Sequence, residues 1–277
     1  MQKINKVFLI LLLTIFLGIF YRVYQSNFDD YWFDEYFGFW ISDPQLNFTD
    51  SLNRIIGPGW GVNLLFDFIL KYFYFFSGYY PENGRYFTVF LSSLSIPLLT
   101  YLSYQIDKSK SYLLTAFITS HCWYLISYSQ EVRGYSFGFL LTIISFIIFL
   151  SIIKTNNQNL KKNIYLALVY FLVNFLGLVN HIFFGIVILS QFIFIFNFTD
   201  EKQKLKIFIT SYFSIGIIYL ALMFPVLMKG LSTESFWIPK IDLEFYISFF
   251  FPRFFGSKFM GYLYLVILIY LTFKSKK

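Results

Sequence analysis

Two short polar segments stand out in an otherwise apolar chain, and each carries side chains that could do chemistry. The first segment, Tyr31-Trp-Phe-Asp-Glu-Tyr-Phe-Gly-Phe-Trp40, places the adjacent acids Asp34 and Glu35 among aromatic residues. A carboxylate near a low-dielectric surface is costly unless it is paired or used. Neighbouring helical residues point about 100° apart, so one acid could face a cleft while a partner holds the other. The alternative is an interfacial loop whose acids only face water.

The second segment, Tyr128-Ser-Gln-Glu-Val-Arg-Gly-Tyr135, contains Glu131 and Arg133. They are the only charged side chains between Ser111 and Ile153. An acid and a base at the mouth of a helix bundle could form a structural ion pair. They could equally hold a phosphate and a sugar hydroxyl, and the spacing leaves both interpretations open.

Three further positions are candidates on residue type. Arg85, in Gly84-Arg85-Tyr86, suits bidentate phosphate contact, although arginine is also a common interfacial anchor. His181 follows Asn180, and a lone histidine is more often structural than catalytic. Trp237, in Ser235-Phe-Trp-Ile-Pro-Lys240, suits a rigid aromatic platform or a simple belt position.

The metal-ligating and redox residues are few. One cysteine, Cys122, excludes an intramolecular disulfide framework, and two histidines give no zinc spacing. The acids could in principle hold Mg²⁺ or Mn²⁺, but no pattern of residues indicates such a site. The sequence therefore predicts no particular cofactor. No glycine-rich phosphate loop is present, which disfavours a soluble nucleotide donor.

The elements that must position these residues are membrane helices. The chain has 277 residues, 57% hydrophobic and 25% aromatic with only 13% charged, against about 25% charged in soluble domains. This composition excludes a soluble enzyme, a nucleic-acid binder and a disordered chain. A spanning helix needs roughly 17–25 mainly apolar residues, and eight segments qualify: Val7–Val23, Tyr86–Tyr104, Ser111–Ser127, Tyr135–Ile153, Ile164–Asn180, Ile182–Phe198, Ile207–Met228 and Phe259–Phe273.

Charge asymmetry orients the predicted spans. With the N-terminus in the cytoplasm, the inner segments hold about 13 of the 22 basic residues and about 3 of the 15 acids, which is the positive-inside pattern. Every candidate residue then lies on the outer face. The sequence therefore predicts one all-α integral membrane domain over 1–277, with long outer loops at 24–85 and 229–258.

The first outer loop contains one helical segment of its own, from Gly61 to Phe76. Asn63, Asp67 and Lys71 recur at i, i+4 and i+8 and form one polar stripe, in which Asp67 and Lys71 could pair. A central charged pair makes spanning costly. We therefore predict a helix that lies in the outer membrane interface.

Five motifs, in order, resemble those of the GT-C glycosyltransferases, specifically the family 39-like group around protein O-mannosyltransferases and aminoarabinose transferases. The resemblance extends over most of the chain. It departs from the family at Gly57-Pro58-Gly59-Trp60, where a His-Pro-Pro segment is common. The motifs are Phe33-Asp34-Glu35-Tyr36, Gly84-Arg85-Tyr86-Phe87, Ser129-Gln130-Glu131-Val132-Arg133-Gly134-Tyr135-Ser136, Gly177-Leu-Val-Asn-His181 and Phe236-Trp-Ile-Pro239.

The resemblance implies a multi-pass enzyme, in a bacterial inner or plasma membrane, with an outward-facing site. It implies transfer of a sugar, as in mannosyltransferases, from a polyprenyl-phosphate donor to a hydroxyl on a lipid, glycan or protein acceptor, with inversion. The expected roles are Asp34 as base and Glu35 as an orienting group. The expected substrate-binding residues are Arg85, Glu131, Arg133, Tyr135, His181 and Trp237. A flippase for lipid-linked sugars, a polysaccharide polymerase or ligase, and a non-catalytic scaffold stay open as alternatives.

Overall fold

The computed structural model describes residues 6–56, 63–109, 111–155, 160–198, 202–231 and 257–274, with the short stretches 243–244, 247–248 and 251–252. Within these ranges the regular structure is helical and no strand occurs. The chain divides into two compact units, Met1–Leu231 and Ser232–Lys277. The helices of the first unit are α1 (Lys6–Val23), α2 (Phe33–Ile41), α3 (Phe48–Ile56), α4 (Leu64–Ser77), α5 (Pro81–Ile106), α6 (Ser111–His121), α7 (Trp123–Ser129), α8 (Tyr135–Lys154), α9 (Leu160–Asn180), α10 (Phe184–Phe198) and α11 (Lys202–Leu231).

Five of the described helices are long and apolar enough to cross a membrane, which supports a multi-pass membrane protein. They match five of the eight predicted spans. Two more predicted spans correspond to shorter apolar helices, Phe184–Phe196 and Lys258–Ile267. The five long segments are Lys6–Val23, Pro81–Ile106, Tyr135–Lys154, Asn163–Asn180 and Lys204–Pro225.

The predicted span Ser111–Ser127 is wrong as a continuous helix. The chain breaks at Cys122 into α6, of 11 residues, and α7, of 7 residues, and each piece alone is too short to cross. Arg22 of α1 binds the carbonyl groups exposed at the break: its Nη2 donates to Thr119 O at 2.9 Å and its Nη1 to Ser120 O at 3.5 Å. Its Nε also donates to Ser92 Oγ of α5 at 2.9 Å. A fully buried arginine therefore satisfies the end of α6 where regular helical bonds stop.

Helices α8 to α11 enclose a hydrophobic core around Tyr170 and Phe208. The polar side chains inside it bond to one another. Ser145 Oγ donates to Asn174 Oδ1 at 3.0 Å and accepts from Gln191 Nε2 at 2.9 Å, and Tyr170 Oη donates to Gln191 Oε1. Such uncharged, mutually bonded groups hold membrane helices together.

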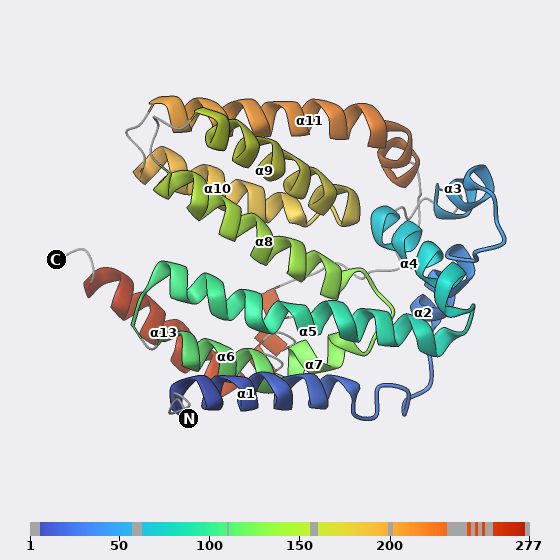
Figure 1. The fold of residues 1–277 in the computed structure, drawn as a ribbon, viewed down its shortest axis with the longest axis horizontal. Coiled ribbons are helices and arrows are strands. Elements are labelled where there is room, and N and C mark those ends of the chain that lie inside the picture. The colour runs from blue at the N-terminus through green and yellow to red at the C-terminus, as the bar shows by residue number, and fades with distance from the viewer. Residues whose placement is uncertain are drawn as a thin grey trace, which may run out of the picture. The chain divides into compact units, whose positions relative to one another are not determined.

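Helices α2, α3 and α4 gather at one end of the long helices (Figure 1). The polar stripe of α4 faces inward: Asn63, Asp67 and Lys71 are all buried. Lys71 Nζ donates to Ser51 Oγ at 2.7 Å and to Leu46 O, so the described contacts pair it with α3 and the α2–α3 turn and show no ion pair with Asp67. The outward face of α4 carries exposed aromatic side chains, at Tyr72, Phe75 and Phe76.

The second unit is described in part and contains α13 (Lys258–Lys274). Phe251 packs edge-on against Tyr262 of this helix, with ring centroids 5.2 Å apart. The close approach requires a glycine, because a Cβ on Gly261 would lie 2.2 Å from the Phe251 ring.

Candidate functional site

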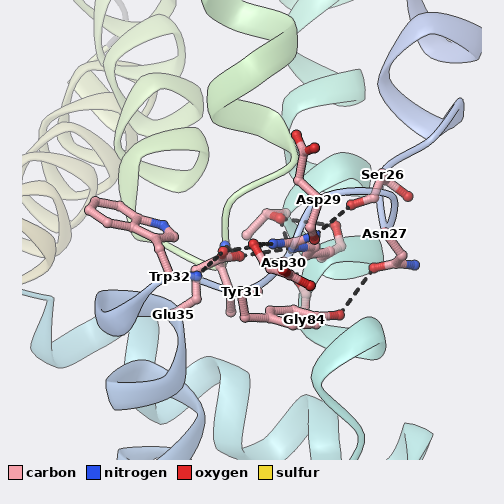
Figure 2. Close-up of polar contacts among 11 residues, drawn as sticks. Ser26, Asn27, Asp29, Asp30, Tyr31, Trp32, Glu35 and Gly84 are labelled. Atoms are coloured by element: carbon pink, nitrogen blue, oxygen red, sulfur yellow. Dashed lines mark hydrogen bonds and ion pairs between the residues drawn. The ribbon is translucent and has the colours of Figure 1, made fainter.

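The centre of the site is a buried ion pair between Glu35, in the first turn of α2, and Arg85, in the first turns of α5. Arg85 Nε donates to Glu35 Oε1 at 2.9 Å, and Arg85 Nη2 donates to Glu35 Oε2 at 2.8 Å. The side chains are only 4% and 1% exposed. The segment from Ser26 to Trp32 folds around this pair, as Figure 2 shows.

Arg85 has no free donor left for a substrate. Its remaining N–H groups bind the carbonyl oxygens of Asp29 at 2.7 Å and of Ser26 and Asp30 at 3.2 Å each. The Tyr31 ring covers the guanidinium at 3.9 Å. Glu35 is equally occupied, because its two oxygens also accept from the backbone N–H groups of Val132 at 2.9 Å and Trp32 at 3.4 Å. The geometry makes both residues positioning groups, and it leaves the phosphate role expected for Arg85 without a donor.

Alternate residues of the loop between α7 and α8 each connect to a different element. Gln130 Nε2 donates to the carbonyls of Arg22 at 3.1 Å and Tyr24 at 3.0 Å, at the end of α1. Val132 N–H binds Glu35 of α2. The carbonyl of Gly134 accepts from Asn180 Nδ2 of α9 at 3.0 Å. This loop therefore joins α1, α2 and α9, and it fixes where the intervening Arg133 side chain lies.

Asp34 and Arg133 meet beside the buried pair and stay accessible. Arg133 Nη1 lies 3.2 Å from Asp34 Oδ2, and the two side chains are 17% and 19% exposed respectively. The guanidinium carbon lies 5.9 Å from the Trp32 ring centroid and 5.6 Å from that of Tyr135. Arg133 Nε is buried and has no hydrogen-bond partner among the described residues. The carboxylate of Asp34 and the guanidinium of Arg133 thus form one partly open pair, in which Nε of Arg133 has no bond to any described residue.

Glu131 adds a carboxyl group whose charge is disfavoured. Burial, and then the nearby Glu35 carboxylate, raise its pKa to about 7, against the opposing effect of Arg133 and Arg85. One of its oxygens, Oε2, is buried without a partner among the described residues. Glu131 can therefore gain or lose a proton near neutral pH.

The structure brings in three residues that the sequence analysis did not place in the site: Asn63, Asp67 and Asn180. Asp67 is buried, and burial raises its pKa to about 8 despite the charge of Arg133. Asn63 Oδ1 and Asn180 Oδ1 are buried without partners among the described residues. The polar stripe of α4 was the feature of the sequence that could have indicated this, because burying polar side chains costs free energy unless they face other polar groups.

His181 and Tyr135 lie at the same end of the helices. Their ring centroids are 6.3 Å apart. His181 Nδ1 accepts the Phe183 N–H at 3.2 Å, so the neutral ring carries its hydrogen on Nε2. Burial, with a smaller effect of Arg133, lowers the His181 pKa, which favours that neutral donor form.

Two expectations concern other parts of the chain. Trp237 and the segment 57–62, which contains the departure from the family pattern, lie outside the described residues. Among the described residues, no group of three or more His, Cys, Asp or Glu side chains is placed to hold a metal ion.

No protein-family model matches the sequence, and the comparisons with curated proteins and with solved structures give no match.

Proposed function

We propose that this chain is a membrane glycosyltransferase that moves a sugar from a polyprenyl-phosphate donor to a hydroxyl acceptor. The observation that carries the proposal is the Asp34–Arg133 pair: a carboxylate and a guanidinium 3.2 Å apart and both partly accessible. Beside it, Glu35 and Arg85 are fully occupied. One pair therefore supplies rigidity and the other is left for substrate.

In the proposed step, Asp34 takes the proton of the acceptor hydroxyl. The acceptor oxygen forms a bond to the anomeric carbon while the bond from that carbon to the phosphate oxygen breaks. The electron pair leaves with the polyprenyl phosphate, and Arg133 stabilises its negative charge. A single displacement at one face inverts the anomeric carbon.

The surroundings of Arg133 suit a lipid phosphate. Its Nε has no partner among the described residues, and the rings of Trp32 and Tyr135 flank the guanidinium. Helix α2, which carries Asp34, also exposes the aromatic side chains of Phe33, Tyr36 and Trp40. A donor with a phosphate head and a hydrocarbon tail matches this combination of charge and lipid-facing surface.

The test is transfer by purified protein in lipid nanodiscs, with radiolabelled undecaprenyl phosphate mannose, glucose and arabinose as donors. Asp34→Asn is expected to lower turnover by roughly 10²–10⁴-fold, the usual contribution of a general base. Asp30→Asn is the matched control, because Asp30 is an exposed acid of the same segment that uses only its carbonyl oxygen in the described contacts. Turnover at the wild-type rate in Asp34→Asn would discard the assignment of the base.

The same purified protein, reconstituted into proteoliposomes for the transport test, separates the alternatives that the sequence leaves open. Movement of a fluorescent lipid-linked sugar across proteoliposomes without any transfer would indicate a flippase. Transfer only from a pyrophosphate-linked oligosaccharide would indicate a polymerase or ligase.

A further inference from the structure

Two amide oxygens lie close to Gly134, beside the Asp34–Arg133 pair, and neither has a hydrogen-bond partner among the described residues. A Cβ built on Gly134 would lie 2.8 Å from Asn63 Oδ1 and 3.2 Å from Asn180 Oδ1. Asn63 is 7% exposed and Asn180 is 0% exposed, and both oxygens lack a hydrogen-bond partner among the described residues. A buried acceptor without a partner destabilises the fold, so two together indicate a ligand that donates hydrogen bonds.

The neighbouring groups define the chemistry of that ligand. Asp67 lies one helical turn after Asn63 on α4 and is close enough to Arg133 to feel its charge. Because burial raises the pKa of Asp67 to about 8, this carboxyl group is mainly protonated at pH 7 and can both donate and accept. Arg133 Nε adds a donor and Glu131 Oε2 an acceptor, neither of which has a partner in the part of the chain that the structure describes.

This set does not suit a cation. A divalent cation needs ionised carboxylates, and the guanidinium of Arg133 repels positive charge. A neutral polyol suits it better, since each hydroxyl donates one hydrogen bond and accepts others.

We propose that Asn63, Asp67 and Asn180 form a hydroxyl-binding subsite that recognises the sugar ring of the lipid-linked donor, while Arg133 contacts its phosphate. The inference rests on the proposed function for the identity of the donor, and it names the residues that select the sugar. Gly134 is the residue that permits the subsite, because a Cβ there would clash with Asn63 Oδ1 at 2.8 Å and crowd Asn180 Oδ1 at 3.2 Å.

The experiment compares binding of two classes of probe to wild-type protein in detergent, by native mass spectrometry or tryptophan fluorescence. One probe is undecaprenyl phosphate alone; the others are undecaprenyl phosphate mannose, glucose, galactose and arabinose. We expect at least one sugar-bearing probe to bind more tightly than the bare carrier. Asn63→Leu and Asn180→Leu should each remove roughly tenfold of that preference, the value of one or two hydrogen bonds. Binding of bare carrier should stay unchanged in Asn63→Leu. It should weaken in Asn180→Leu, because that variant also loses the bond from Nδ2 to Gly134 O, which helps to position Arg133.

Thermal stability provides a second readout that separates a ligand site from a structural role. Removal of an unpaired buried acceptor should hold or raise the melting temperature of Asn63→Leu, whereas loss of a structural hydrogen bond would lower it. Asn83→Leu is the control, because Asn83 Nδ2 binds the carbonyls of Ser77 and Gly78. It is expected to lose stability and keep the sugar preference.

The outcomes distinguish the subsite from the transferase assignment. An unchanged preference in both asparagine variants, or no preference in the wild type for any sugar, would overturn the subsite even if transfer occurs. A preference that the variants abolish would support the subsite even if no transfer is detected. A shift in melting temperature with Mg²⁺ alone that Asn63→Leu abolishes would assign a cation site and also overturn the proposal.

Discussion

Glu131 is the residue whose charge state should depend most on pH near neutrality. Its pKa is raised from the ordinary value of 4.5 to about 7, first by burial and then by Glu35. The unfolded chain therefore loses this proton at lower pH than the folded protein does. As pH rises from about 4.5 to about 7, the folded state loses stability relative to the unfolded state, and above about 7 this contribution is constant.

Glu131→Gln should remove this slope. Melting temperatures of wild type and variant, measured in nanodiscs from pH 4.5 to 8, should diverge with rising pH, with the variant more stable at the high end. Asp67 produces a slope of the same sign up to about pH 8, and subtracting the two curves cancels it. Parallel curves would show that Glu131 is ionised normally in the folded protein.

The sequence predicted which charged residues would converge, but not how they would pair. Asp34, Glu35, Arg85 and Arg133 were all singled out, because charge is rare in this chain and each sits among aromatic residues. That Glu35 and Arg85 use up each other's hydrogen bonds depends on the packing of segments 50 residues apart. Residue spacing contains no information on such a contact, so the family resemblance leaves Arg85 among the expected substrate-binding residues.

Asn180 and Gly134 are residues of the site that the sequence analysis did not identify. Both lie within motifs that the sequence analysis quoted, but neither has an ionisable side chain and neither was assigned a role. Their importance comes from the close approach of Gly134 to α4 and α9, which tertiary structure alone reveals.

At the scale of the helix, apolar length was a reliable signal and helix continuity was not. The predicted spans over α1, α5, α8, α9 and α11 correspond to long helices. No proline or glycine lies at the break at Cys122, so the sequence contains no residue type that predicts a break there. Arg22, which binds the carbonyl groups at the break, lies about 100 residues away in α1. An arginine inside a predicted span does not indicate which groups will accept its hydrogen bonds.

The packing of α1 against α6 depends on Gly18. A Cβ there would lie 2.6 Å from Ser120 Oγ of α6 and 2.8 Å from Ile96 Cδ1 of α5, so α1 approaches both helices closely at a small residue. Gly18→Val should push α1 away and disturb the Arg22 contacts just beyond it. We expect a loss of about 1–3 kcal/mol in the free energy of unfolding, as for other overpacked interiors.

Gly216→Val is the matched control for this prediction. Gly216 also lies inside a long apolar helix, but a Cβ there meets nothing within 4 Å. Unfolding of both variants in mixed detergent micelles gives the comparison. Equal losses in the two would show that valine acts through helix propensity rather than through the α1–α6 contact.

In the first unit of the molecule, the number of membrane crossings before α6 decides which side of the membrane each later loop faces. Helix α4 turns its polar stripe inward and exposes aromatic residues. Its 14 residues cover about 21 Å at 1.5 Å each, short of a bilayer core of about 30 Å. Helix α5, with 26 residues, is long enough. We therefore interpret α2, α3 and α4 as interfacial and α5 as the single crossing between residues 30 and 108.

This interpretation predicts that positions 30 and 108 lie on opposite sides of the membrane. Both side chains are exposed. In a Cys122→Ala background, which removes the only native thiol, Asp30→Cys should react with an impermeant maleimide on intact bacterial cells. Lys108→Cys should react only after permeabilisation, because the positive-inside pattern predicts that the lysine-bearing loops face the cytoplasm.

The parity of crossings makes the labelling result decisive. If α4 also crossed the membrane, the chain would cross twice between the two positions, and both cysteines would label from the same side. Helices α6 and α7 together, though not separately, are long enough for one crossing. With that crossing, the basic loops beyond α7 would face outward, against the charge asymmetry. The Asp34–Arg133 pair would then have to join segments from opposite faces, although its atoms lie 3.2 Å apart. Labelling on opposite sides instead leaves one water–lipid boundary at which Asp34, Arg133 and a lipid-linked substrate can meet.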